Sequence, residues 1–244
     1  YILSVFRWYN ILKNLNTAVK FKECLKYDLS SIVFNYIIPI GELSGEIVRG
    51  FYLFNEKKIN KKIVIMSLIY DRGSGAITLI LSSLLALPFL LYYKYQDIGL
   101  ILFVGLILFI FFIKSLIINF LFFVLRKFNL IRYFKKKINY KKLFINILIS
   151  LTSFLFYFLA LLFLFEINYI EINVIFLLLL IFPIGLLMIA LPISPGGIGV
   201  GSASFIILSE FFFGAKYFYL ENGILVLQIF FLTMGVLSFL LIFL

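Results

Sequence analysis

Five charged residues stand beside or within apolar segments, where an ionised side chain is unusual, and they are the best candidates for chemistry. Glu42, Glu46 and Arg49 follow one apolar run at spacings of four and three, which places them on one face of a helix. Asp71 and Arg72 interrupt a second apolar run. A charge at mid-membrane costs about 3 kcal/mol or more, so such groups usually pair, face a cavity and serve function.

Neighbours on a helix point in different directions, so Asp71 and Arg72 each need a partner elsewhere. We predict that Asp71 pairs with Arg49 and that Arg72 pairs with Glu46 or Glu42, because the signs are opposite and the expected depths are similar. The alternative is that Asp71 and Arg72 lie at the headgroup boundary and stay hydrated. Guanidinium groups bind phosphate strongly, so both arginines are candidate ligands for an anionic group.

The composition indicates a membrane protein. Of 244 residues, 64% are hydrophobic and only 14% are charged, whereas soluble domains are nearer half apolar and a quarter charged. This excludes a disordered chain, a secreted disulfide domain and a nucleic-acid binder. The sequence has no histidine, and Cys24 is its only cysteine. We therefore expect no catalytic residue, no metal site and no cofactor.

A membrane-spanning helix needs about 20 mostly apolar residues. Runs of this kind predict spans at 63–93, 98–125, 143–165, 172–191 and 223–244. Two further segments, 29–48 and 192–213, are too short or too broken to be ordinary spans. The expected fold is an all-α polytopic integral membrane protein in one domain, 1–244, with about five or six transmembrane helices and one or two re-entrant hairpins.

Basic residues in short loops predict the orientation, because cytoplasmic loops are enriched in lysine and arginine. The loop 126–142 is strongly basic, and 49–62 and 7–26 are basic as well, so all three are predicted to be cytoplasmic. The segment between 26 and 49 must then enter the membrane and return as a re-entrant hairpin. The alternative is that 29–40 lies along the interface. The net charge of +11 fits cytoplasmic loops that face anionic lipid.

Proline and glycine interrupt both unusual segments. The predicted breaks are Pro39 and Pro192, and the residues near them that we expect at a binding site are Gly45, Ser194, Pro195, Gly196, Gly197 and Gly199. Paired Gly/Pro-interrupted segments in two halves of a membrane chain indicate a transporter-type site, with an inverted repeat as one possible arrangement. Ordinary tight turns between spans are the alternative.

The second break has the composition of an anion site. Free backbone N–H groups from Gly196 to Gly199, together with the positive end of a helix beginning near Ile198, would form a cradle for a phosphate.

Three motifs carry a resemblance to a known family. Gly-Glu-x-x-Arg at Gly45–Arg49, the pair Asp71-Arg72 and Pro-x-Ser-Pro-Gly-Gly-x-Gly at Pro192–Gly199 occur in the same order as in the flippase-like membrane domain of lysylphosphatidylglycerol synthases and its stand-alone relatives. The similarity runs from Phe6 to the end, and it implies that one or two N-terminal spans are missing. The family usually has Glu-Arg where this chain has Asp71-Arg72.

The resemblance implies lipid handling in a bacterial or archaeal cytoplasmic membrane, without the synthase activity of the separate soluble domain. The first hypothesis is translocation of an anionic phospholipid or a polyprenyl-phosphate-linked sugar. The alternatives are a membrane-embedded transferase, with Glu42, Glu46 or Asp71 as base, and an accessory subunit that anchors a soluble partner through 126–142. A glycosyltransferase or a lipid-modifying enzyme would be the partner.

Overall fold

The computed structural model describes residues 1–38, 42–94, 140–164, 172–189, 194–213 and 218–243, and all regular structure within them is helical. The helices are α1 (Ile2–Asn14), α2 (Phe21–Ile37), α3 (Leu43–Asn55), α4 (Lys61–Lys94), α7 (Tyr140–Leu164), α8 (Ile172–Ile189), α9 (Val200–Phe213) and α10 (Phe218–Phe243), with a 3₁₀ turn η2 (Pro195–Gly197). The predicted span 98–125, the breaks Pro39 and Pro192 and nearly all of the loop 126–142 lie outside the described residues.

The helices fall into two length classes. At 1.5 Å per residue, the 34 residues of α4 extend about 51 Å and the 26 of α10 about 39 Å, more than the ~30 Å hydrocarbon core. The paired helices α2, α3, α8 and α9 have 17, 13, 18 and 14 residues, so each is about 20 to 27 Å long. Two helical stretches among the described residues are long and apolar enough to cross a membrane, Lys61–Leu84 and Phe144–Phe163.

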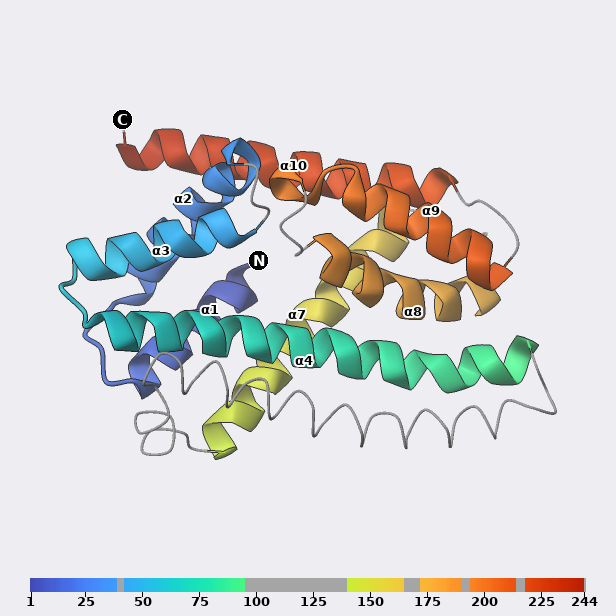
Figure 1. Cartoon of the computed structure of the whole chain (residues 1–244), viewed down its shortest axis with the longest axis horizontal. Coiled ribbons are helices and arrows are strands. Elements are labelled where there is room, and N and C mark those ends of the chain that lie inside the picture. Colours follow the sequence, from blue (N-terminus) through green and yellow to red (C-terminus); the bar gives the residue numbers. More distant parts are fainter. Residues whose placement is uncertain (39–41, 95–139, 165–171, 190–193, 214–217, 244) are drawn as a thin grey trace.

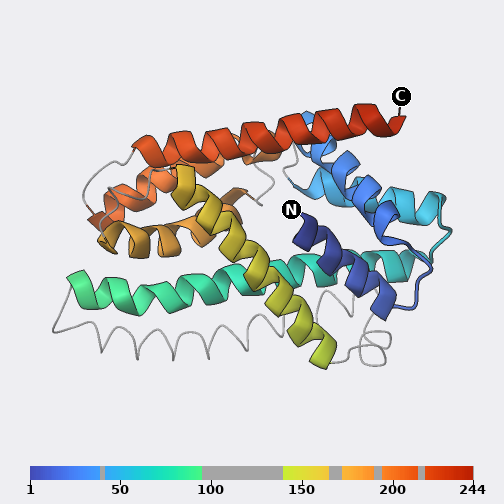
Figure 2. The same cartoon turned by 180° about the vertical axis from the view of Figure 1, so that it is seen from behind.

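The paired helices form two hairpins that approach the centre of the molecule from opposite ends (Figures 1 and 2). Helix α2 runs inward and α3 returns beside it, and α8 and α9 do the same from the other side. Helix α2 packs on α10 and on the turn η2, while α4 packs on α8. A hairpin followed by a long helix therefore occurs twice, and each long helix packs against the hairpin of the other half.

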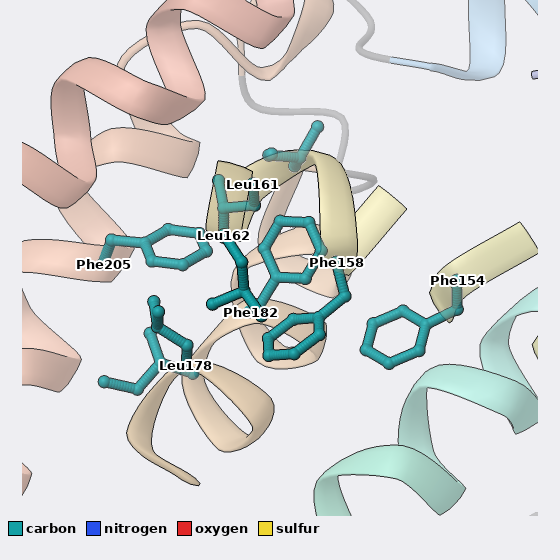
Figure 3. Close-up of a cluster of buried hydrophobic side chains, with 9 residues drawn as sticks. Phe154, Phe158, Leu161, Leu162, Leu178, Phe182 and Phe205 are labelled. Carbon is teal, nitrogen blue, oxygen red and sulfur yellow. The ribbon is translucent and has the colours of Figure 1, made fainter. Parts of the chain in front are cut away.

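Glycine allows each hairpin to close tightly. A Cβ atom at Gly45 on α3 would lie 2.6 Å from Asn35 Oδ1 and 2.9 Å from the backbone oxygen of Ser31 on α2, so any larger residue would force the two helices apart. A Cβ atom at Gly185 on α8 would overlap the ring of Phe205 on α9. Figure 3 shows the aromatic core around that second contact, where Phe154 and Phe158 of α7 pack with Phe182 and Phe205.

At the second break the chain changes direction at two glycines that have positive φ. Gly196 and Gly197 have φ of +58° and +69°, values that residues with a Cβ rarely adopt. Gly196 also lies against the ring of Tyr36 on α2, where a Cβ atom would overlap that ring. The tip of one hairpin therefore touches the other at a position that only glycine can occupy.

We predict that Gly196→Ala lowers the free energy of unfolding by about 1 to 3 kcal/mol, because alanine suffers both the positive φ and the clash with Tyr36. The matched control is Gly73→Ala on α4, where a Cβ atom meets nothing within 4 Å. That change should be neutral or stabilise the helix by up to about 1 kcal/mol. Thermal unfolding in detergent compares the two, and equal transition temperatures for both variants would contradict the packing described.

Candidate functional site

Arg49 of α3 lies at the centre of a buried network of charges. Its Nη1 donates to Asp28 Oδ1 at 2.7 Å, and its Nη2 donates to Asp71 Oδ2 at 3.2 Å and to Glu46 Oε1. The guanidinium carbon also lies 4.6 Å from the centroid of the Trp8 ring, within the range of a cation–π contact. Helices α1, α2, α3 and α4 thus all meet at one arginine.

Two further arginines complete the network. Arg7 Nε of α1 donates to Asp71 Oδ1 at 2.7 Å, and Arg7 Nη1 donates to Ser150 Oγ of α7 at 2.9 Å. Arg72 Nε donates to Glu46 Oε1 at 2.6 Å, and its Nη1 donates to Glu42 Oε2. The predicted pairing of Asp71 with Arg49 is confirmed, and Arg72 pairs with both predicted glutamates.

Burial makes this network a strong constraint on the fold. Asp71, Arg49 and Glu46 are 2%, 5% and 6% exposed. Removing one partner of a buried ion pair costs several kcal/mol, because the remaining charge has lost its water and its counter-ion. The helices can therefore pack only in the register that brings all of these groups together.

A cavity of about 510 Å³ adjoins the network and reaches both hairpins. One part of its wall is charged, with Arg7, Asp28, Glu42, Glu46, Arg49, Asp71 and Arg72. Another part is apolar and aromatic, with Leu79, Phe154, Tyr157, Leu186, Leu187 and Ile189. Gly196 of the second break and Gln228 of α10 also line it. The wall of the cavity thus carries both charged and apolar side chains.

The structure gathers the five predicted charged residues and Gly196 around this cavity, and it places the other candidates elsewhere. The N–H of Gly45 donates to Asn35 Oδ1 at 2.7 Å, so this group is used within the α2–α3 hairpin. Ser194, Pro195, Gly197 and Gly199 do not line the cavity wall. Within the described residues no group of three or more Cys, Asp or Glu side chains is arranged to hold a metal ion.

The predicted glycine cradle is wrong for two of its four N–H groups. Gly197 N donates to Ser194 O and Ile198 N donates to Pro195 O, both at 3.1 Å. The positive φ of Gly196 and Gly197 bends the chain into a 3₁₀ turn that satisfies these donors internally. The next helix begins at Val200, two residues later than expected, after an exposed Gly199.

Sequence reasoning missed several residues of the site. Arg7 was assigned to a basic cytoplasmic segment, but it is bound to Asp71 because α1 carries it to the centre of the molecule. Asp28 stands just before an apolar run, and no prediction from the sequence included it. Its position one turn from Ile32 on the same helix was the available signal. Tyr36 and Gln228 meet across the halves, where Tyr36 OH donates to Gln228 O at 3.0 Å, and no local pattern predicts that contact.

The described residues are all helical where they are regular, two of their helical stretches are long and apolar enough to cross a membrane, and charged side chains line a cavity between them. These features are compatible with a helical membrane protein that has an internal polar site. The chain matches the family described as lysylphosphatidylglycerol synthase TM region over residues 1–238. It belongs to that family, which places it among membrane proteins connected with lipid. No curated protein and no solved structure matches the chain.

A different ion pair, at the edge of the molecule, shows the contrast between surface and buried charge. Glu23 accepts from the backbone N–H of Lys20 at 2.8 Å and pairs with Lys57 of the α3–α4 connection. The N–H of Lys20, and then the Lys57 ammonium, lower the pKa of Glu23. The stabilisation from this pair is therefore present above the ordinary carboxyl pKa and is lost as the pH falls through the lowered value.

We predict that Arg7→Met lowers the free energy of unfolding by about 3 kcal/mol, because it removes one of two cations that hold the buried Asp71. The control is Glu23→Gln, which removes a partly exposed pair and should cost less than about 1 kcal/mol. Unfolding in detergent, followed by circular dichroism, gives both values. A larger loss for Glu23→Gln would refute the buried network as the main electrostatic constraint.

Proposed function

We propose that this protein translocates a phosphate-bearing lipid, either an anionic phospholipid or a polyprenyl-phosphate-linked sugar, across the cytoplasmic membrane. The observation that carries the proposal is the cavity, which has arginines on one part of its wall and apolar side chains on another. A lipid has the same division between a charged headgroup and apolar tails. Membership of the family supports a role with lipid and leaves the substrate open.

The two hairpins fit a transport mechanism. Helix α2 starts and α3 ends at the same end of the molecule, near the basic residues that predict the cytoplasmic side (Figure 1). Because both helices are shorter than the hydrocarbon core, a hairpin that enters and returns accounts for them better than two spans. The second hairpin enters from the opposite end, which supports an inverted repeat with the binding site where the two broken segments meet.

Arg72 is the arginine best placed to meet a headgroup. Its side chain is 42% exposed, against 6% for Arg49, and both line the cavity. Arg49 also keeps one buried donor, Nε, without a partner. Glu42, Glu46 and Asp71 hold the guanidinium groups in place, so a phosphate must compete with carboxylates and is not bound too tightly to be released.

We predict that Arg72→Gln slows headgroup translocation about tenfold in reconstituted vesicles, because one charge-assisted hydrogen bond to phosphate contributes about 1.5 kcal/mol or more. The assay follows tail-labelled phosphatidylglycerol, and a prenyl-phosphate-linked glucose in parallel, by loss of the outer-leaflet signal. Lys57→Gln is the matched control, since Lys57 pairs with Glu23 outside the cavity wall. Equal rates for Arg72→Gln and wild type with both lipids would reject the proposed site.

A further inference from the structure

The cavity wall contains carboxylates as well as arginines, and the proposed function does not explain how an anionic headgroup binds beside them. Among the described residues that line the wall there are three arginine and four carboxylate side chains, so the acidic side chains outnumber the basic ones. Each guanidinium group is paired with at least one carboxylate. An anionic headgroup that accepts from one of the N–H groups in these ion pairs displaces a carboxylate, and the displaced carboxylate would be left charged and buried.

Glu46 differs from Asp71 in the hydrogen bonds that its two carboxylate oxygens accept. Glu46 Oε1 accepts from Arg49 and from Arg72, while its Oε2 is buried without a hydrogen-bond partner. Both oxygens of Asp71, by contrast, accept from an arginine. Among the described residues, Glu46 Oε2 is the one carboxylate oxygen that is both buried and unpartnered. Gln228 Oε1 is a second buried oxygen in the cavity wall that accepts no hydrogen bond. The cavity therefore has hydrogen-bond acceptors for which the described residues supply no donor.

We propose that Glu46 is the site at which one proton is taken up when an anionic headgroup binds, so that headgroup movement is coupled to a proton. This inference rests on the proposed function. A proton from solvent water bonds to Glu46 Oε2, and the ion pairs of Glu46 with Arg49 and Arg72 are released. Phosphate oxygens then accept from Arg49 Nη2 and Arg72 Nε. No covalent bond of the lipid is broken, and for a singly charged phosphate diester the proton balances the added charge, so the formal charge of the cluster stays unchanged.

The surroundings of Glu46 favour it over its neighbours as the proton acceptor. The other charged and titratable groups of the described residues that line the same cavity are Tyr1 just before α1, Arg7 of α1, Asp28 and Tyr36 of α2, Arg49 of α3, Asp71 and Arg72 of α4, Tyr157 of α7, and Glu42 just before α3. Asp71 is held by Arg7 as well as Arg49, so a phosphate that takes Arg49 leaves it paired. Glu42 is about one-third exposed, and water can stabilise its charge. Glu46 loses both of its arginines in one step.

The test counts protons during headgroup binding. Purified protein in nonionic detergent is titrated with dihexanoyl phosphatidylglycerol, and separately with geranyl phosphate, in two buffers of different ionisation enthalpy. The difference in heat gives the number of protons taken up. We expect about one proton per headgroup for the wild type, with affinity falling about tenfold per pH unit above neutrality. Glu46→Gln should bind with no proton uptake and no such pH dependence, and Glu23→Gln should behave as wild type.

The outcomes separate the two levels of the proposal. Wild-type binding without proton uptake would overturn the coupling and leave the proposed function intact. Proton uptake that persists in Glu46→Gln would show that another residue takes up the proton, and it would overturn the assignment to Glu46. If neither probe binds the wild type, the proposed function fails and the inference with it. If Glu46→Gln does not fold, the wild-type count still tests the coupling, and Glu46→Asp, which keeps a carboxylate, should take up a proton where Glu46→Ala should not.

Discussion

The structure depends on burying several charges at one place in an otherwise apolar protein. Arg49 meets carboxylates from α2, α3 and α4, and Arg7 extends the network to α1 and α7. Desolvation makes each of these groups unfavourable alone, and only complete pairing compensates for it. Apolar packing in a membrane discriminates poorly between registers, because lipid tails are as apolar as leucine. The charged network is therefore what fixes how these helices sit together.

The two hairpins share the architecture but not the chemistry. The first contributes the charged side of the cavity, through Asp28, Glu46 and Arg49. The second contributes Gly196 and the apolar residues Leu186, Leu187 and Ile189. The first hairpin thus supplies charged side chains to the cavity wall, and the second supplies mainly apolar ones. That asymmetry matches the proposed lipid substrate, whose headgroup is charged and whose tails are apolar.

Local patterns in the sequence predicted much of this arrangement. The helical class and the pairing of Asp71 with Arg49 both followed from hydropathy and from the free energy of burying a charge. Arg7 and Gln228 were missed because their importance comes from residues more than 60 positions away. The glycine cradle failed for a local reason: composition cannot tell whether a turn satisfies its own N–H groups.

The most direct test of the account asks whether a phosphate headgroup reaches the arginine network. Trp8 is the only tryptophan, and Arg49 lies 4.6 Å from its ring, so its fluorescence reports on that guanidinium group. Titration with dihexanoyl phosphatidylglycerol should change the emission of Trp8 saturably, while dihexanoyl glycerol, which lacks the phosphate, should not. An unchanged emission, or the same change with the neutral lipid, would contradict headgroup binding at this network.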